Sequence, residues 1–414
     1  MRCKLLYISD CTIYGGSDRS IINIINFISE NSENEIVFGY RYFKEYKQGV
    51  NRDLSSRATQ VPLRLLSNDT LYFRINKRIS SIYIRRLIKV PFWIIQKAGI
   101  YNIFNYVKLR FFIHKIKPDI VHINNGGYPA SSVCLNAVFA AKHCGVNRIV
   151  LHINNPAEKP SNPVQRFIDG KISEYTKIFI SGSKQTKESL QTNRGFSCDK
   201  LLQIYNTIEH PVINKDRETI LKKYNIDSDK FIITEVAFLS KRKGQIFLLE
   251  AILKIKERQP DIYKNIVVFL VGDGIERQNL INFCRTNELA NVIFTGYLPD
   301  FADYINAADL FILPSIEGED MPLVVLSAMA LRKAIISTCV AGIMEEIENG
   351  VSGVLLRITE LVLLDDHILK LYSDKNLREF YALNAQKRYN ELFLREKICN
   401  QFKLLYNKLM DDML

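Results

Sequence analysis

Apolar residues occur along the chain in short runs that alternate with stretches at helical spacing. The first run, Leu5–Ser9, is followed by a glycine-containing turn and then by apolar residues from Ile21 to Ile28 that recur as on one face of a helix. This order predicts a strand, a loop and a helix. Further strands in the first half are predicted at Ile36–Tyr40, Ile120–Ile123, Arg148–His152 and Lys177–Ser181, with helices at about residues 131–143 and 162–175.

The pattern restarts after His210-Pro211. Strands are predicted at Phe231–Val236, Ile266–Val271, Val292–Phe294, Leu310–Leu313, Ala334–Ser337 and Gly353–Leu355, with helices between them. Alternation of strand and helix indicates a parallel, doubly wound sheet, so the 414 residues predict two Rossmann-like α/β domains. Asn206 and Pro211 interrupt the periodic structure, which places the linker at Tyr205–Asp216.

The eight cysteines are spread along the chain, with no C-x-x-C pair and no metal-ligand spacing among them. This spread predicts free thiols in a reducing cytoplasm. The first apolar run is too short for the core of a signal peptide, and the sequence has no run of about eighteen uncharged apolar residues. We therefore expect a cytoplasmic protein that is neither secreted nor membrane-spanning.

Positive charge is concentrated in the first half. Residues 1–210 hold 30 Lys and Arg against 15 Asp and Glu, whereas residues 211–414 hold 26 against 29. Residues 64–117 alone hold 12 basic residues and one acidic residue, interleaved with aromatic side chains. This composition suits an anionic membrane surface, because basic residues attract acidic lipids and aromatic rings settle at the headgroup level. The alternatives are ordinary helices with solvated charges and, less favoured because no recognised motif accompanies the charge, nucleic acid.

The stretch from Leu310 to Leu356 carries the most informative functional pattern. A short apolar strand ends at Pro314, polar and acidic residues follow as far as Asp320, and residues 321–331 carry apolar side chains at helical spacing. The first N–H groups of such a helix are free to bind an anion. The pattern therefore predicts a phosphate-binding turn of the kind that a sugar nucleotide needs.

This stretch resembles the signature of the retaining, nucleotide-sugar-dependent glycosyltransferases of the GT-B fold, family 4 (glycosyl transferases group 1). In that signature a Glu, seven further residues and a second Glu follow a Pro-Ser strand end. The first Glu corresponds to Glu319, and Ser327 stands where the second is expected. Glu317 is the alternative carboxylate if the turn is one bulge longer.

Other segments that resemble the family's motifs follow in the same order along nearly the whole chain, except between about residues 44 and 116. They are Gly15-Gly16-Ser17-Asp18-Arg19, Pro118-Asp119-Ile120-Val121-His122, His152, Ser181-Gly182-Ser183, Asn206-Thr207-Ile208, Lys243-Gly244, Val271–Glu276, Phe294-Thr295-Gly296-Tyr297 and Ala308-Asp309-Leu310. Two further departures are Phe238, where the family often has an Arg, and Met344, where it has a Pro. The resemblance rests on the order and spacing of these segments together.

The resemblance implies two Rossmann-like domains that face a central cleft and a C-terminal helix that returns to the first domain. Residues 1–210 are then the acceptor-binding domain, residues 211–385 the nucleotide-sugar-binding domain and residues 386–414 the returning helix. It also implies transfer with retention, in which the departing phosphate helps to deprotonate the incoming hydroxyl, without a catalytic metal or a cofactor. The only Asp-x-Asp, Asp227-Ser228-Asp229, precedes a strand and is typical of a turn.

The resemblance also assigns the residues of the site. Glu319 and His152 are the catalytic candidates. The donor phosphates are expected at Arg242, Lys243, Gly16, Met321, Pro322 and Leu323, and the nucleotide at Gly272, Gly274, Tyr297 and Ser327. Cations and N–H donors suit a diphosphate leaving group, and a carboxylate suits sugar hydroxyls and a positively charged sugar ring.

Each of these assignments has a structural alternative. The run Lys241-Arg242-Lys243 is also typical of solvated charge, a lone His at a strand end is usually structural, and Glu319 also suits a helix N-terminus through the helix dipole. The resemblance implies that a Glu at position 327 binds the two ribose hydroxyls of the nucleotide through charge-assisted hydrogen bonds. Ser327 can form only one such bond and carries no charge, which weakens binding of the nucleotide by about 1–3 kcal/mol.

We therefore expect a glycosyltransferase at the inner face of the cell membrane that builds a capsular, O-antigen or similar surface polysaccharide. The expected partners are a UDP- or GDP-sugar donor, a glycan or lipid-linked acceptor, and an anionic membrane surface that residues 64–117 contact; nucleic acid is not expected. The main alternative is a non-catalytic relative that acts as a binding or scaffolding subunit. A sugar-nucleotide hydrolase or epimerase on the same fold is a third reading.

Overall fold

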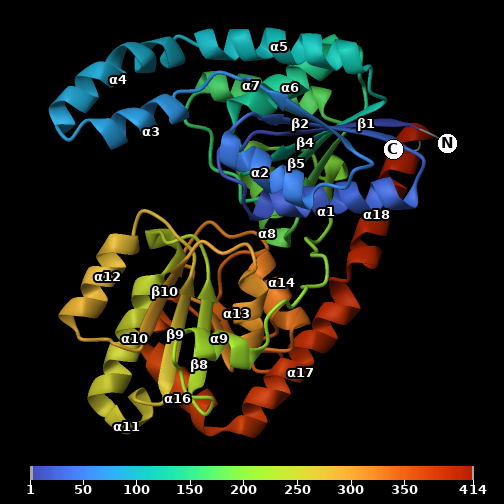
Figure 1. The fold of residues 1–414 in the computed structure, drawn as a ribbon. Coiled ribbons are helices and arrows are strands. Elements are labelled where there is room, and N and C mark those ends of the chain that lie inside the picture. Colours follow the sequence, from blue (N-terminus) through green and yellow to red (C-terminus); the bar gives the residue numbers. More distant parts are fainter. Residues whose placement is uncertain (1–2, 413–414) are drawn as a thin grey trace. The chain divides into compact units, whose positions relative to one another are not determined.

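The computed structural model describes residues 3–412, apart from the side chains of Thr70, Phe73, Arg74 and Lys77. The chain forms two compact units (Figure 1). The residues up to Ile204 and those from Cys399 onward make the first unit, and Tyr205–Ile398 makes the second. The chain therefore passes between the units at Ile204–Tyr205, where the predicted linker begins, and again within the last helix.

The first unit is built on a sheet of seven parallel strands in the order β3-β2-β1-β4-β5-β6-β7. The strands are β1 (Lys4–Ser9), β2 (Glu35–Arg41), β3 (Thr59–Leu63), β4 (Ile120–Asn125), β5 (Ile149–Ile153), β6 (Ile178–Ser181) and β7 (Leu201–Gln203). The order of the strands reverses between β1 and β4, and a doubly wound sheet opens to a ligand at such a point. In register, Ser9 pairs with Tyr40 on one side and Asn124 on the other, so the residues that follow these three lie together at the carboxyl edge.

Helices cover both faces of this sheet. They are α1 (Gly16–Asn31), α2 (Lys44–Asp53), α3 (Asp69–Arg78), α4 (Ile82–Lys97), α5 (Ile100–Ile116), α6 (Ser132–His143), α7 (Pro163–Tyr175), α8 (Lys184–Arg194), the 3-10 helix η1 (Cys198–Lys200) and most of α18 (Arg395–Met410). The core on one face joins the inward side chains of α5, α6, α7 and α8 to alternate residues of the strands, such as Leu151 and Ile153 of β5. Successive strand residues point to opposite faces, so His152 between them points to the other face.

The C-terminal helix α18 packs on that other face through aromatic and histidine side chains. The Tyr7 hydroxyl donates a hydrogen bond to the Tyr406 hydroxyl at 3.0 Å, and Tyr406 also bonds Nδ1 of His122 at 2.8 Å. The ring of His152 lies 5.5 Å from that of His122 and 5.9 Å from that of Phe402. The predicted return of the C-terminal helix to the first domain is therefore confirmed.

The second unit has a sheet of six parallel strands in the order β10-β9-β8-β11-β12-β13, again with one reversal, between β8 and β11. The strands are β8 (Phe231–Val236), β9 (Ile266–Val271), β10 (Val292–Gly296), β11 (Leu310–Leu313), β12 (Ala334–Thr338) and β13 (Val354–Leu356). Every residue of β8, β9, β11 and β12 is buried, as expected of parallel strands that are covered on both faces. The α/β fold class with two doubly wound parallel sheets is confirmed.

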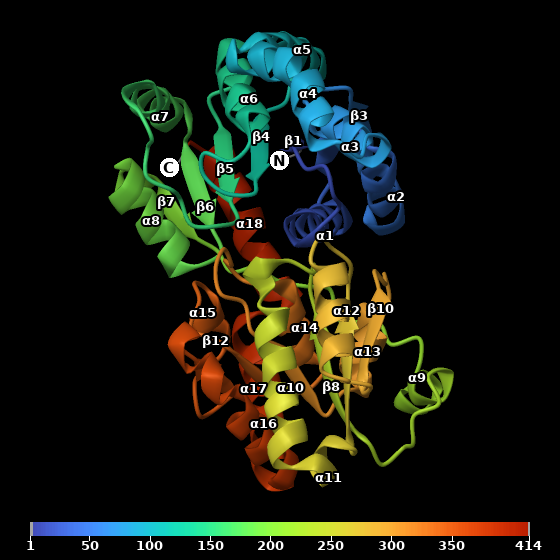
Figure 2. The ribbon, with the colours of Figure 1, turned by 90° about the vertical axis from the view of Figure 1, so that its left-hand side faces the viewer.

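The helices of this unit form two layers (Figure 2). They are α9 (Arg217–Lys223), α10 (Gln245–Arg258), α11 (Pro260–Tyr263), α12 (Arg277–Thr286), α13 (Phe301–Ala307), α14 (Leu323–Ala330), α15 (Ile343–Glu346), α16 (Leu364–Ser373) and α17 (Lys375–Leu392), with the 3-10 helices η2 (Lys241–Lys243) and η3 (Ile358–Leu363). One core lies under α10, α12 and α16, and the other under α9, α13, α14, α15 and α17.

Sequence periodicity did not predict two strands of the first unit. Both β3 and β7 lie at the edges of their sheet, and only one residue of each is buried. Pro62 within β3 is tolerated because an edge strand leaves one row of N–H groups unpaired. Across residues 3–412, none of the helices combines the length and the apolar character needed to cross a membrane.

Candidate active site

The predicted phosphate turn lies at the reversal of strand order in the second sheet. The loop that follows β8 ends in η2 (Lys241–Lys243), and the loop that follows β11 runs from Pro314 to Pro322 before α14 begins at Leu323. The backbone N–H of Ile316 donates to the carbonyl oxygen of Arg242 at 2.9 Å, so the two loops are joined directly. Neighbouring parallel strands, far apart in sequence, thus bring both predicted parts of the site to one edge.

Glu319 is the centre of the polar contacts at this edge. Its Oε1 accepts hydrogen bonds from Ser315 Oγ at 2.8 Å, from Arg242 Nη1 at 3.3 Å and from Lys243 Nζ. The Glu319 side chain is only 7% exposed, and a buried carboxylate is stable when it is paired in this way. Glu317 is exposed, so of the two candidate carboxylates Glu319 is the one that is buried and paired with cations; its role in catalysis stays a prediction.

Close backbone approach fixes the shape of the cation-bearing loop. Gly244 has φ +72°, and a Cβ added there would lie 2.0 Å from the carbonyl oxygen of Pro314. Gly272 has φ +148°, and its Cβ would lie 1.9 Å from the carbonyl oxygen of Ala237. Only glycine allows three strand-end loops to approach so closely, which explains the glycines of the Lys243-Gly244 and Gly272-containing segments.

Other residues assigned to the donor lie at the same edge of the second unit. Met321 and Pro322 are buried where α14 begins, and Leu323 is its first residue. Gly274 approaches the carbonyl oxygen of Leu239, and Tyr297, 58% exposed, follows β10. The structure thus gathers these positions, while their contact with a nucleotide stays a prediction.

Ser327, which replaces the expected second Glu, is turned onto its own helix. Its Oγ donates to the Leu323 carbonyl oxygen at 2.8 Å, and the residue is 4% exposed. A serine bonded to the carbonyl four residues earlier is a common way to satisfy a hydroxyl inside a helix. The hydroxyl is therefore already occupied within α14.

Glu346 is a functional candidate that the sequence analysis did not select. It is fully buried at the end of α15, and neither of its carboxylate oxygens has a hydrogen-bond partner among the described residues. Burial first, and then the negative charges of Glu319, Asp320 and Glu345, raise the pKa of Glu346 well above its usual value, while Lys243 acts in the opposite sense. Burial without a partner therefore favours the protonated form of the Glu346 carboxyl over its charged form.

A signal for this burial was present in the sequence. Ile343, Glu346 and Ile347 stand at helical spacing, and the two isoleucines are buried together with the Glu. In the register of the family resemblance, Glu345 takes the position of the Glu that follows the family's Pro, and Glu346 has no counterpart in that motif.

The first-unit candidates lie in different environments. His152 is 1% exposed, packs against Phe402, and has no hydrogen-bond partner for either ring nitrogen among the described residues. Burial lowers its pKa to about 4, so the ring is neutral at physiological pH. This environment is that of a packing residue, and a role of His152 in sugar transfer stays a prediction. Gly16 is exposed at the first position of α1.

Within residues 3–412, no three His, Cys, Asp or Glu side chains gather as a potential metal site. Arg242 and Lys243 supply positive charge beside Glu319.

The Gly244→Ala substitution tests the tight loop. A side chain at φ +72° costs about 1–3 kcal/mol in backbone strain, and the contact with Pro314 adds to this because the carbonyl cannot move without displacing Ser315. We expect a loss of stability in chemical unfolding that exceeds the strain alone.

Gly350→Ala is the matched control, because Gly350 has φ +75° but nothing within 4 Å of an added Cβ. The Gly350→Ala variant therefore measures the loss of unfolding free energy that backbone strain causes without a steric clash. Equal losses of unfolding free energy in the two variants would contradict the close approach of Gly244 to Pro314.

The Glu346→Gln substitution tests the buried acid. Because the pKa of Glu346 is raised in the folded state, its carboxyl binds a proton that the unfolded chain releases above about pH 4.5. The wild type therefore loses up to about 1.4 kcal/mol of stability per pH unit as the pH rises from there toward the folded pKa, and the Gln variant does not. We expect the unfolding temperature of the variant, relative to that of the wild type, to rise as the pH increases above about 4.5.

Glu348→Gln is the control, since Glu348 follows α15 closely but its side chain is 58% exposed. The Glu348→Gln substitution should shift the unfolding temperature little across the same pH range. A Glu346→Gln variant whose difference from wild type does not change with pH would show that Glu346 is ionised in the folded protein.

Comparison with known proteins agrees with this arrangement. The family pattern described as "Glycosyl transferases group 1" matches residues 216–388, and that described as "Glycosyltransferase Family 4" matches residues 62–210. N-acetyl-alpha-D-glucosaminyl L-malate synthase of Bacillus anthracis is 26% identical over 352 residues, which cover 83% of this chain and 88% of that protein. The capsular polysaccharide biosynthesis glycosyltransferase CapM of Staphylococcus aureus is 25% identical over 245 residues, or 58% of this chain and 61% of CapM.

Solved structures show the same fold. A glycosyltransferase from Rickettsia africae superposes with a TM-score of 0.77 at 16% identity and 99% coverage of both chains. HepE of Anabaena, solved in complex with UDP-glucose, superposes with a TM-score of 0.74 at 17% identity, covering 98% of this chain and all of HepE. The two matched patterns, the two doubly wound sheets and the returning helix together show that this chain belongs to the GT-B fold glycosyltransferases of family 4.

Proposed function

We propose that this glycosyltransferase moves a sugar, with retention, from a UDP- or GDP-sugar onto a lipid-linked or surface-polysaccharide acceptor. The observation that carries the proposal is the convergence of Arg242 and Lys243 on the buried carboxylate of Glu319 at the strand-order reversal of the second sheet. Two cations and a carboxylate at one strand edge match the charges of a sugar nucleotide and of its transition state.

The cations act on the leaving group. Breaking the bond between sugar and diphosphate moves negative charge onto the phosphate, and fixed cations lower the barrier to that separation. Arg242 is partly exposed and Lys243 lies beside it on η2, so both side chains reach a ligand at the edge with small rotations. The first N–H groups of α14 add donors for the same phosphates. In this proposal, cations of the chain fill the role for which many transferases use a metal.

The carboxylate acts on the sugar. When the diphosphate attracts Arg242 and Lys243, Glu319 is free to accept hydrogen bonds from sugar hydroxyls and to stabilise positive charge on the ring. The departing phosphate then takes the proton of the incoming hydroxyl on the same face, which gives retention without a separate base. Crystals of HepE in complex with UDP and with UDP-glucose support a nucleotide-sugar donor for this fold.

The acceptor assignment rests on relatives and on the surface of the first unit. CapM is named for capsular polysaccharide biosynthesis, and another relative, TuaC of Bacillus subtilis, for teichuronic acid biosynthesis, at 34% identity over 129 residues. These names favour a glycan of the cell surface. Such glycans are often built on lipid carriers, so we propose that the enzyme acts at the inner face of the cell membrane.

Helices α4 and α5 supply a surface for membrane contact. Neither end of α4 is anchored by burial, since it has no buried residue, and Figure 1 shows it extending away from the sheet of its own unit. Tyr83, Leu87, Val90 and Ile94 form an exposed apolar stripe along α4 at helical spacing, and Ile100, Ile103, Phe104, Val107 and Phe111 form one along α5. We call these the α4 stripe and the α5 stripe.

Basic side chains flank the stripes. Arg85, Arg86 and Lys89 lie on α4 beside the apolar positions, and Lys97 lies 5.9 Å above the ring of Trp93. An exposed apolar stripe flanked by positive charge is typical of helices that lie in the interface of an anionic membrane. The alternative in which the helices pack against the first domain describes the buried face of α5, but it does not explain the exposed stripes or α4, which has no buried residue.

A non-catalytic binding role is the second candidate, and Ser327 is its motivation. The hydroxyl is engaged within α14, so the ribose loses the charge-assisted pair that a Glu provides. The paired Glu319 and the glycine-shaped loops favour retained activity.

The donor proposal is tested with Glu319→Gln and Lys243→Ala. We expect both variants to lose donor turnover, by about 100-fold or more if each removes about 3 kcal/mol of transition-state stabilisation. The measurement is hydrolysis and transfer from a panel of UDP- and GDP-sugars by the full chain, with UDP and GDP binding followed by calorimetry. Glu317→Gln is the matched control and should retain activity, since Glu317 is exposed.

Ser327→Glu separates the two candidate functions. If the wild type binds UDP or GDP and the added Glu strengthens binding by about tenfold, the enzyme proposal stands. If no nucleotide binds to the wild type and binding appears only with Glu at this position, the chain is a non-catalytic relative.

The membrane proposal is tested with Leu87→Glu in the α4 stripe. Leu87 is 74% exposed, so a charge there should not disturb the fold, but it opposes insertion. We expect at least tenfold weaker binding to vesicles of acidic phospholipid, because partial burial of one leucine contributes about 1.5 kcal/mol or more. Added salt should weaken binding further.

Leu383→Glu is the control, because Leu383 is 52% exposed on α17 of the second unit. It should bind vesicles as the wild type does. Wild-type protein that remains in solution with acidic vesicles would refute the membrane contact.

A further inference from the structure

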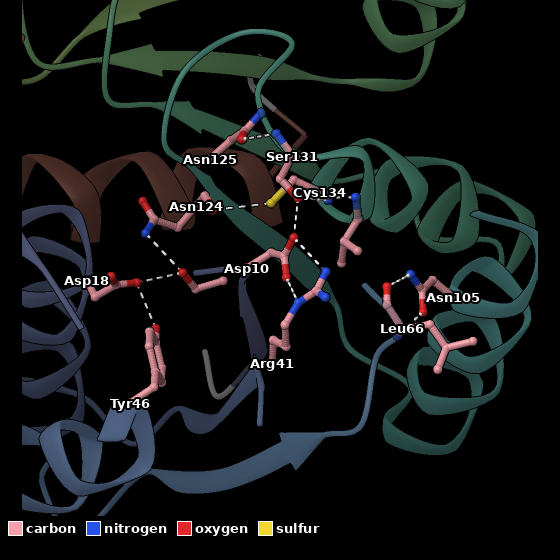
Figure 3. Close-up of polar contacts among 12 residues, drawn as sticks. Asp10, Asp18, Arg41, Tyr46, Leu66, Asn105, Asn124, Asn125, Ser131 and Cys134 are labelled. Atoms are coloured by element: carbon pink, nitrogen blue, oxygen red, sulfur yellow. Dashed lines mark hydrogen bonds and ion pairs between the residues drawn. The ribbon is translucent and has the colours of Figure 1, made fainter. Parts of the chain in front are cut away.

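The first unit has a polar pocket at its own reversal of strand order. A cavity of about 470 Å³ opens where β1, β2 and β4 end, and residues from α4 and α5 line its opposite side. Asp10 follows β1, Arg41 ends β2 and Asn125 ends β4 (Figure 3). Ser131, at the start of α6, completes the floor. We call this cavity the strand-end pocket.

An ion pair is buried in the floor of the pocket. Arg41 Nε donates to Asp10 Oδ1, and Arg41 Nη2 donates to Asp10 Oδ2 at 3.1 Å. Their side chains are 6% and 9% exposed. The Ser131 hydroxyl donates to the same Asp10 carboxylate. These contacts hold both charged groups in fixed positions, as a binding site requires.

Two buried hydrogen-bond donors of residues that line the pocket have no partner among the described residues. One is Nη1 of Arg41, and the other is Nδ2 of Asn125. The Asn125 Oδ1 is occupied by the backbone N–H of Ser131 at 3.2 Å, which fixes the amide so that its NH₂ group stays unused. A buried N–H group without a partner costs about 1–3 kcal/mol, so these donors indicate a ligand that supplies oxygen acceptors.

The charges of the lining select a neutral ligand. Asp10 neutralises Arg41, and Asp69 adds one negative charge to the rim. A carboxylate or phosphate entering this pocket would meet no uncompensated cation and two carboxylates. A hydroxyl suits it better, because its oxygen accepts from Arg41 or Asn125 while its hydrogen is donated to Asp10.

The opposite wall is suited to a ring. Tyr101 and the amides of Gln96, Asn102 and Asn105 line it. Asn105 is itself fixed by two hydrogen bonds to the backbone of Leu66, at 2.7 and 2.9 Å, so the wall does not collapse into the pocket. An aromatic ring with several amides is a common lining for polyhydroxylated rings, whose C–H faces pack on the aromatic side chain.

We propose that the strand-end pocket binds a neutral, polyhydroxylated sugar ring of the acceptor. Adjacent hydroxyls of the ring accept hydrogen bonds from Arg41 Nη1 and Asn125 Nδ2, and one donates to the Asp10 carboxylate. The name acceptor rests on the proposed function, whereas binding of a neutral sugar rests on the pocket alone.

The helices that line the pocket also carry the proposed membrane surface. Gln96 belongs to α4, and Tyr101, Asn102 and Asn105 belong to α5, the helices of the two exposed stripes. A lipid-linked sugar held at the membrane surface therefore has its ring beside the pocket. The Bacillus anthracis relative is named for L-malate. L-malate is a dicarboxylate, whereas the strand-end pocket suits a neutral ligand.

The test is ligand binding by the full chain, observed by saturation-transfer NMR and calorimetry. The probes are the methyl glycosides of glucose, galactose and N-acetylglucosamine, compared with L-malate and inorganic phosphate. We expect at least one glycoside to bind and neither anion to displace it. Binding or displacement by L-malate or phosphate at this pocket overturns the proposal, as does the absence of binding by every glycoside.

Asn125→Asp is the sharpest variant, because it keeps the acceptor for the Ser131 N–H and replaces only the unused NH₂ group. We expect glycoside affinity to fall at least tenfold. Arg41→Lys, which keeps the charge opposite Asp10 but removes the planar donor set, should do the same. Asn147→Asp is the matched control and should leave affinity unchanged, because Asn147 is exposed, lies outside the pocket lining and keeps its acceptor for Lys142 Nζ. Unchanged affinity in both pocket variants overturns the assignment of these donors.

UDP and GDP binding, measured on the same protein, separates this proposal from the proposed function. Nucleotide binding without glycoside binding refutes the strand-end pocket alone. Glycoside binding that both pocket variants weaken, without any nucleotide binding, supports the pocket and refutes the donor site.

Discussion

Parallel strand pairing with a single reversal of order is the constraint on which the rest of each unit depends. At the reversal, two adjacent strands lead to helices on opposite faces. Their carboxyl ends are left uncovered, although each of these strands is paired with a neighbour on both sides. In the second unit these ends belong to β8 and β11 and bring Lys243 to Glu319. In the first unit they belong to β1 and β4 and place Asp10 near Asn125. Both candidate sites follow from this one topological feature.

The second unit holds two buried glutamates in different environments. Glu319 accepts hydrogen bonds from Arg242, Lys243 and Ser315, whereas Glu346 has no hydrogen-bond partner for its carboxylate among the described residues. Burial and the neighbouring negative charges, including that of Glu319, raise the pKa of Glu346 well above its usual value. The cations at this edge are therefore used by one glutamate, and the other is left without a partner.

In the first unit, packing residues and polar residues occupy different parts of the sheet. His122 and His152 point to the face covered by α18 and are neutral and buried there, while polar groups gather where the strands end. Helix α4 adds no buried residue to the core of this unit. Both α4 and α5 leave apolar side chains exposed to solvent. A surface of that kind is stable only because the sheet and its two helix layers already supply the core.

The sequence by itself determined most of the strands, both sheets as parallel, and the turn around Glu319. These features depend on local patterns of apolar residues and on glycines such as Gly244. Such patterns can be read from the sequence without knowing which distant segments pack against them. The edge strands β3 and β7 were missed because partial burial leaves little periodicity. Only the tertiary structure decided which charges are paired. Helical spacing with Ile343 and Ile347 indicates that Glu346 faces inward, but no local pattern shows that its carboxylate has no partner there or joins Arg41 to Asp10. Desolvation and ion pairing arise only once distant segments meet.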